Sequence, residues 1–129
     1  MKKTLSFIVT VLMLFSLTGC GKYSSKYRAV GFVHSNESTS ALMEFYTFDG
    51  RMVFQLKSTG EGDLKYSAQL ESGSATVYYD YLGTKSALFS ISSGDEIDSH
   101  GGYVEAGTVY IIVETNGACR NGKFQFSLD

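Results

Sequence analysis

The most polar cluster of the sequence lies in residues 95–102, where Asp95, Glu96 and Asp98 stand close together and two glycines follow. Hard cations such as calcium bind several carboxylate and carbonyl oxygens on a bent loop. If a metal binds this chain, these three carboxylates are its first candidate ligands. Their spacing is not that of an EF-hand, and the alternative is a solvated acidic loop.

Tyrosines form a second cluster, in which Tyr78 and Tyr110 are expected to point away from the core. Flat rings beside polar groups are how many β-sandwich domains bind sugars, so these two residues are candidate ligand-binding residues. The alternative is structural, because tyrosine fits a half-buried strand surface well. The chain has no tryptophan, which weakens the sugar hypothesis.

Catalytic residues are hard to find in this sequence. An activated serine or cysteine needs a neighbouring base, and the only histidines are His34 and His100. The common serine-hydrolase, zinc and phosphate-loop motifs are absent. We therefore predict a non-enzymatic protein without a cofactor. An enzyme would need a carboxylate pair assembled by folding, for example around Asp80 or Asp95.

The elements that must position these residues are β-strands. Period-two alternation of apolar and polar residues, with breaks at Gly, Ser, Asn and Asp, predicts strands and no helix after residue 26. Asp49-Gly50 predicts a tight hairpin between two of them, and residues 92–102 are expected to form a long polar loop. The predicted strands cover residues 27–34, 41–48, 51–57, 63–71, 74–82, 85–91, 107–114 and 123–128, with a short edge strand at 103–105.

Two segments define the core most clearly. Residues 63–71 alternate strictly and predict one buried and one solvated face. In residues 107–114, Tyr110 and Ile112 make the second face apolar as well, so this strand is expected to be central and covered on both sides. Short strands at this spacing are typical of an all-β antiparallel β-sandwich, here with seven to eight strands after an N-terminal signal helix.

The N-terminus has the parts of a secretory signal: Lys2 and Lys3, an apolar run over residues 5–17, and small residues before a cleavage point. The run is too short to span a bilayer comfortably. It ends in Leu17-Thr18-Gly19-Cys20, which resembles the lipobox of bacterial lipoproteins. The alternative is an ordinary signal peptide with a chance cysteine, which would leave a secreted domain.

The lipobox resemblance implies a cellular location. In that family the signal, here residues 1–19, is removed, and Cys20 carries the lipid that holds the protein on the membrane outside the cytoplasm. Gly21 is not the aspartate used for inner-membrane retention, so the outer membrane is the default in a host with two membranes. A lipidated Cys20 would leave Cys119 without an intrachain partner, and no disulfide is expected.

Composition limits the partners. The full chain has a net charge of −2, and removal of the two signal lysines leaves −4. This argues against nucleic acid, which requires a basic surface. Lys22, Lys26 and Arg28 precede the first acidic residue and would aid docking to anionic headgroups. Residues 20–26 are expected to be the lipidated cysteine and a polar tether, and residues 27–129 the domain.

A second resemblance covers residues 41–129. Residues 64–79, 105–113 and 122–126 are similar to small jelly-roll domains in uncharacterised lipoproteins of Gram-positive bacteria, and distantly similar to the pre-peptidase C-terminal type of β-sandwich. The resemblance rests on strand pattern and glycine placement, and it implies a fold without catalytic residues. We therefore expect a lipid-anchored binding or interaction module with an envelope protein or glycan as partner; the alternative is a carbohydrate-binding module that uses exposed tyrosines.

Overall fold

The computed structural model describes residues 23–128, and this part of the chain consists of strands without a helix. The predicted all-β class is therefore confirmed, with nine strands in place of seven to eight. The predicted signal peptide, Cys20 and the start of the tether lie outside the described residues. The strands are β1 (Lys26–Val30), β2 (Val33–Asn36), β3 (Ser40–Ser58), β4 (Gly62–Ser72), β5 (Ser74–Tyr81), β6 (Thr84–Ser92), β7 (Glu96–Val104), β8 (Gly107–Thr115) and β9 (Cys119–Leu128).

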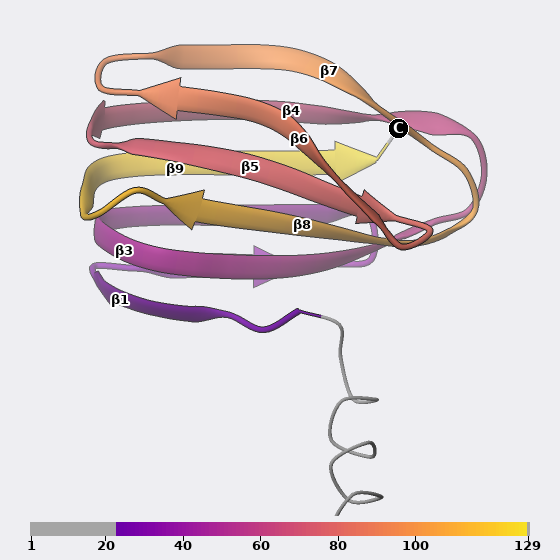
Figure 1. The fold of residues 1–129 in the computed structure, drawn as a ribbon, viewed down its shortest axis with the longest axis horizontal. Coiled ribbons are helices and arrows are strands. Elements are labelled where there is room, and N and C mark those ends of the chain that lie inside the picture. Colours follow the sequence, from indigo (N-terminus) through magenta and orange to yellow (C-terminus); the bar gives the residue numbers. More distant parts are fainter. Residues whose placement is uncertain (1–22, 129) are drawn as a thin grey trace, which may run out of the picture.

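All strand pairs are antiparallel, and they join into one sheet with the order β6-β5-β8-β3-β9-β4-β7. Strands β1 and β2 pair with the remaining edge of β3. The sheet is folded on itself, so that its two halves face each other across the core (Figure 1). We call them the β8 layer (β6, β5, β8 and β3 from Arg51 onward) and the β9 layer (β2, β3 up to Phe48, β9, β4 and β7).

The predicted hairpin at Asp49-Gly50 is wrong, because both residues lie inside the 19-residue strand β3. This strand pairs with β9 up to Phe48 and with β8 from Arg51 onward, so it passes from one layer into the other. Gly50 has a φ of 138°, and a Cβ there would lie 2.3 Å from the carbonyl oxygen of Lys26. The glycine therefore permits a bend under β1 instead of a chain reversal.

A second glycine marks the same bend two strands away. Gly73 separates β4, in the β9 layer, from β5, in the β8 layer, and has a φ of 105°. A Cβ at this position would lie 2.7 Å from the sulfur of Cys119, at the start of β9. We call the line along which the layers meet, marked by Gly50 and Gly73, the crease. The backbone there is packed too closely for a side chain at either glycine position.

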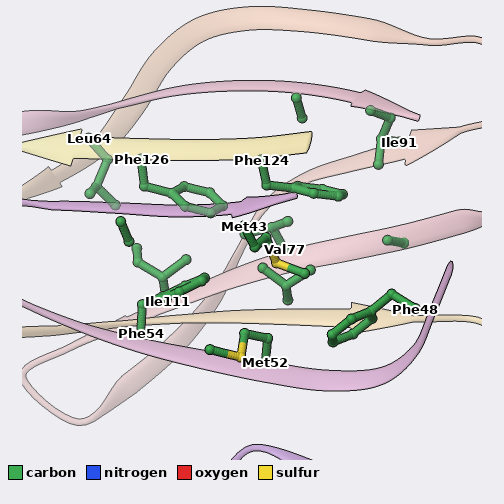
Figure 2. Packing of buried hydrophobic residues seen from close by; sticks show 14 of the residues in the cluster. Met43, Phe48, Met52, Phe54, Leu64, Val77, Ile91, Ile111, Phe124 and Phe126 are labelled. Atoms are coloured by element: carbon green, nitrogen blue, oxygen red, sulfur yellow. The ribbon is translucent and has the colours of Figure 1, made fainter. Parts of the chain in front are cut away.

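The core fills the space between the layers with aromatic and aliphatic side chains (Figure 2). The ring of Phe89 in β6 lies 6.5 Å from that of Phe124 in β9 and 4.6 Å from that of Tyr66 in β4. These contacts cross from one layer to the other. Full burial of a large apolar side chain contributes about 1.5–3 kcal/mol, and the fully buried ones include Phe48, Phe54, Phe124, Met43, Leu56, Leu64, Ile91 and Ile111.

Two predictions about the core are confirmed. Leu64, Ala68 and Leu70 of β4 are buried, while Lys65 and Gln69 between them are exposed. Strand β8 is covered on both sides, since Ile111 and Ile112 are both fully buried.

The free edge of β3 in the β8 layer is covered by side chains from the N-terminal segment. Ser25 Oγ accepts a hydrogen bond from the Val53 amide at 2.8 Å. The Asn36 side chain accepts from the Gln55 amide and donates to the Gln55 carbonyl, at 2.9 and 2.8 Å. A chain without proline thus satisfies the backbone groups of an exposed strand edge with polar side chains.

Candidate functional site

Tyr78 and Tyr110 lie on the outer face of the β8 layer, on neighbouring strands. Tyr78 is paired with the buried Ile112, and Tyr110 with Asp80. The core residues Val77 and Ile111 alternate with them and point inward. The two tyrosines and Asp80 therefore belong to one surface, where a buried carboxylate stands beside an aromatic ring.

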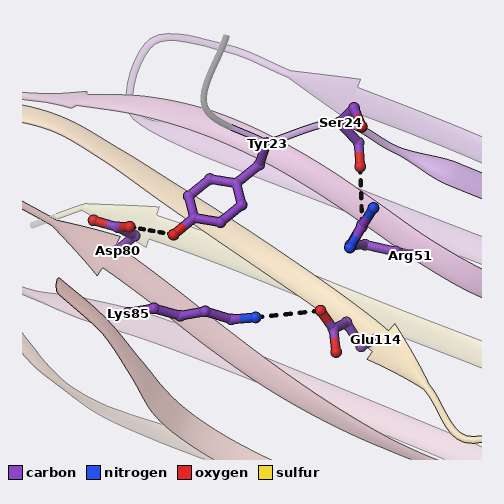
Figure 3. A network of polar contacts seen from close by, with 6 residues as sticks. All are labelled: Tyr23, Ser24, Arg51, Asp80, Lys85 and Glu114. Carbon is purple, nitrogen blue, oxygen red and sulfur yellow. Dashed lines mark hydrogen bonds and ion pairs between the residues drawn. The ribbon is translucent and has the colours of Figure 1, made fainter. Parts of the chain in front are cut away.

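Asp80 is 2% exposed and is the only buried polar or charged residue among those described. Its carboxylate accepts a hydrogen bond from the Tyr23 hydroxyl (Figure 3). This hydrogen bond, together with burial and the negative charge of Asp80, raises the pKa of Tyr23 to about 12. The Tyr23 ring also meets the Tyr110 ring edge-on, at a centroid distance of 5.4 Å. Tyr23, the first described residue, is thus held on the candidate surface by a hydrogen bond and a ring contact.

Tyr78 is covered by another group of the protein itself. The Lys85 ammonium lies 4.3 Å from the centre of the Tyr78 ring and 3.4 Å from the Glu114 carboxylate (Figure 3). A cation over a tyrosine face is attracted by the negative centre of the ring. The two sequence-predicted tyrosines are therefore brought together on one face, where Tyr23 and Lys85 already contact them.

The outer face of the β9 layer is different, because it is hollowed and lined by both polar and apolar side chains. A row of side chains crosses five strands in register: Ser35, Leu42, Gln125, Ser67 and Asp98. These residues line an open hollow, and a second hollow beside it adds Gln69, Glu96 and Lys123. The row offers hydroxyl, amide and carboxylate groups, which together can donate and accept hydrogen bonds.

Only part of this hollow was visible in the sequence. The alternation in residues 63–71 placed Ser67 and Gln69 on a solvated face. The partners of Ser67, Gln125 and Asp98, lie 58 and 31 positions further along the chain, and strand pairing alone brings them together. The Ser67 hydroxyl donates to the Gln125 side-chain oxygen at 3.2 Å.

The segment predicted as an acidic loop is mostly strand. Glu96 and Asp98 belong to β7, which pairs with β4 and packs the partly buried Ile97 against the core. Asp95 ends a tight turn, where its carboxylate accepts a hydrogen bond from the Ser92 amide at 2.9 Å. Within residues 23–128, no three His, Cys, Asp or Glu side chains are arranged to hold a metal ion. The loop expectation failed because residues 96–104 supply the edge strand that β4 requires.

Cys119 is fully buried at the crease. Its sulfur donates a hydrogen bond to the Ser74 carbonyl at 3.3 Å, and burial raises the pKa of the thiol. Burial keeps the thiol protonated and shields it from reagents. Strand β9 starts at Cys119 and not at the predicted Lys123, because Cys119 and Arg120 already pair with β3.

The histidines sit apart from each other. The His34 ring stacks on the Phe32 ring at 4.8 Å, and Nδ1 of His100 lies 3.4 Å from the Asp63 carboxylate. Neither contact involves a nucleophilic side chain.

No protein-family model matches the chain, and no curated protein matches it. Among solved structures, the chain is similar to the pre-peptidase C-terminal domain of collagenase from Bacillus anthracis, with 15% identity and a TM-score of 0.49 over 74% of this chain and 91% of that one. It is also similar to a family 29 carbohydrate binding module complexed with cellulohexaose, with 12% identity and a TM-score of 0.42 over 81% and 77% of the two chains. A third likeness is to the Drosophila melanogaster CENP-C cupin domain, with 13% identity and a TM-score of 0.35 over 82% and 76%. At such identities the likeness concerns the β-rich fold alone, and no residue role follows from it.

Proposed function

We propose that the chain is a non-enzymatic binding module of the bacterial cell envelope, held by lipid on Cys20 to the membrane surface that faces away from the cytoplasm. The lipobox-like Leu17-Thr18-Gly19-Cys20 supports the anchor. The partner binds to the outer face of the β9 layer. The observation that supports this most is the open hollow lined by Ser67, Asp98 and Gln125.

The hollow suits an extended, hydroxyl-rich ligand such as an envelope glycan. Amide and carboxylate side chains form directional hydrogen bonds with hydroxyl groups, and the row across β2, β3, β9, β4 and β7 presents them along one line. Basic Lys123 and acidic Glu96 stand beside it, so the surface carries both signs of charge. A neutral or weakly charged polymer therefore fits this surface better than a highly charged one.

Co-sedimentation with purified, insoluble cell-wall glycan tests the ligand. We expect the wild-type protein to sediment with the glycan and the Gln125→Ala and Asp98→Ala variants to lose most of this binding. Ser86→Ala, on β6, is a control outside the hollow. Sedimentation of every variant at the wild-type level would contradict a ligand on the β9 layer.

A second candidate function is a carbohydrate module that uses Tyr78 and Tyr110. It is favoured by the shared outer face on which both rings lie. In this case Tyr78→Ala, and not Gln125→Ala, abolishes sedimentation, and removal of the Tyr23 side chain strengthens binding because it frees the Tyr110 ring. The same assay therefore separates the two candidates.

Metabolic labelling with a palmitate analogue tests the anchor. Labelling of the wild-type protein and none of Cys20→Ala is the expected result. Equal labelling of the two proteins would overturn the proposed anchor.

A further inference from the structure

The first two strands present a surface of unusual composition. Lys26, Arg28 and Val30 of β1 alternate with Ala29, which packs against the core, and with Tyr27, whose ring stacks on Phe48, so the first three point outward. Val33 of β2 is also exposed, and both valines are 62% exposed. Single exposed apolar residues are common on proteins, whereas a contiguous apolar patch rimmed by polar residues marks an interaction site.

We call the segment formed by β1 and β2 the N-terminal ribbon. Aromatic contacts hold its inward side against the core. Tyr27 stacks on Phe48 at a ring distance of 5.0 Å, and Phe32 meets Phe48 at 5.3 Å. The ribbon therefore cannot turn over to bury its valines without breaking its contact with the core.

The exposed surface continues onto β3. A Cβ at Gly31 would lie 3.2 Å from the Cβ of Tyr46, so the ribbon runs directly beside this tyrosine, which is 49% exposed. Arg120 donates a hydrogen bond to the Tyr46 hydroxyl at 3.0 Å. We call the set formed by Lys26, Arg28, Val30, Val33 and Tyr46 the docking edge. Of the six exposed large hydrophobic residues in the described part of the chain, three belong to the docking edge and a fourth, Tyr27, adjoins it.

The chain leading to this edge is short and is held to the domain by hydrogen bonds. Tyr23 donates a hydrogen bond to Asp80, and the Ser24 carbonyl accepts one from Arg51 at 2.9 Å (Figure 3). The Ser25 hydroxyl accepts a hydrogen bond from the Val53 amide. Only Gly21 and Lys22 separate Cys20 from the fastened segment. At an extended reach of about 3.6 Å per residue, Cys20 lies within about 11 Å of Tyr23. The expected six-residue tether is thus reduced to two residues.

We propose that the docking edge lies on the bilayer, with Lys26 and Arg28 at anionic headgroups and the two valines and Tyr46 in the interfacial region. This inference rests on the proposed lipid on Cys20. Acidic groups stand near the edge, with Asp49 opposite Arg28 and Glu44 opposite Val33. Lys26, Arg28 and Arg120, which contacts Tyr46 of the edge, outnumber these two carboxylates. Strand β7, which carries Glu96 and Asp98, is at the far end of the β9 layer and points away from the membrane.

Tryptophan quenching in vesicles tests this orientation, because the chain has no tryptophan of its own. The lipidated protein is reconstituted into phosphatidylcholine and phosphatidylglycerol vesicles with brominated acyl chains. We expect strong quenching in Val30→Trp and Val33→Trp, and none in the matched Tyr103→Trp, which replaces a 52% exposed residue on β7. Equal quenching at all three positions, or at none, would overturn the orientation.

Charge reversal tests the electrostatic part in the Val30→Trp background. Each basic residue near an anionic surface favours the docked orientation about fivefold, so Arg28→Glu should shift it by at least that factor. Lys85→Glu, on β6, makes the same change in net charge and is expected to leave quenching unchanged. An equal loss in both variants would contradict contact through the docking edge.

Flotation of the same vesicles separates this inference from the proposed anchor. If protein labelled on Cys20 floats with the vesicles and Val30→Trp is not quenched, the anchor stands and the orientation is wrong. If the protein is neither labelled nor floats, the anchor itself is wrong, and the orientation falls with it.

Discussion

The two outer faces of the folded sheet are both built from antiparallel strands, but one buries its carboxylate and the other exposes it. On the β8 layer, Asp80 is buried and bonded to Tyr23. On the β9 layer, Asp98 lines an open hollow in a row with Ser67 and Gln125. One face is covered by the protein's own N-terminal residues, and the other is left open.

The difference follows from the side chains that the central strand of each layer presents on its outer face. The outer side of β8 carries Ile112, which is fully buried, so burying its neighbours removes apolar surface from water. The outer side of β9 carries Lys123, Gln125 and Ser127, whose burial would cost hydrogen bonds with water. The N-terminal segment therefore lies on the first face and not on the second.

The largest expected effect comes from removing the buried carboxylate. Asp80→Ala should lower the free energy of unfolding by about 2–3 kcal/mol, because it deletes the acceptor of a buried, charge-assisted hydrogen bond. Asp98→Ala makes the same change in charge on the open face and should cost less than about 0.5 kcal/mol. Urea unfolding followed by circular dichroism measures both, and equal losses would abolish the distinction between the faces.

Removing only the donor should have a smaller effect. Tyr23→Phe keeps the ring contact with Tyr110 and loses the hydroxyl, so we expect a loss of about 1.5 kcal/mol. Tyr46→Phe removes an exposed hydroxyl from the other layer and is the matched control, with an expected change within about 0.5 kcal/mol. A Tyr23→Phe variant as stable as the wild type would show that the N-terminal segment is not fastened by this bond.

Alkaline pH should weaken the same bond. The pKa of Tyr23 rises from 10.0 to about 12 on folding, so the folded state holds this proton more tightly than the unfolded state. Its contribution to stability is complete below pH 10 and is lost as the pH rises towards 12. The stability gap between the wild type and Tyr23→Phe should therefore shrink across this window. The variant serves as the reference, since Tyr81 and Tyr103 also have raised pKa values. A constant gap would contradict the assignment.

The smallest effect is expected for the open face. Ser67→Ala and Gln125→Ala each remove one side of a single 3.2 Å hydrogen bond between exposed groups, so each should change stability by less than about 0.5 kcal/mol. Thermal unfolding is a sufficient measurement. A larger loss would mean that the polar row supports the fold, and would weaken its role as a ligand surface.

Strand positions were largely predictable because each depends on local alternation. The segment 63–71 was found nearly at its observed bounds, since Leu64, Ala68 and Leu70 point inward at every second or fourth position. Asp49-Gly50 misled the prediction because the same dipeptide suits a hairpin and a bend. Only the approach of β1 over Gly50 decides between the two.

The candidate site was less predictable. The outward positions of Tyr78 and Tyr110 followed from alternation, but their contacts with Tyr23 and Lys85 did not. Tyr23 and Asp80 are 57 residues apart, and no local pattern relates them. The metal hypothesis for Asp95, Glu96 and Asp98 assumed a bent loop, whereas two of these residues alternate along a strand that pairs with β4.

The sequence by itself determined that the chain is all-β, that residues 107–114 form a central strand, and that the N-terminus resembles a lipoprotein signal, because each of these depends on residues close together in the chain. The tertiary structure alone decided which strand passes between the layers, which face is closed by Tyr23 and which is left hollow. Those features depend on strand register, and register joins residues that no local pattern connects.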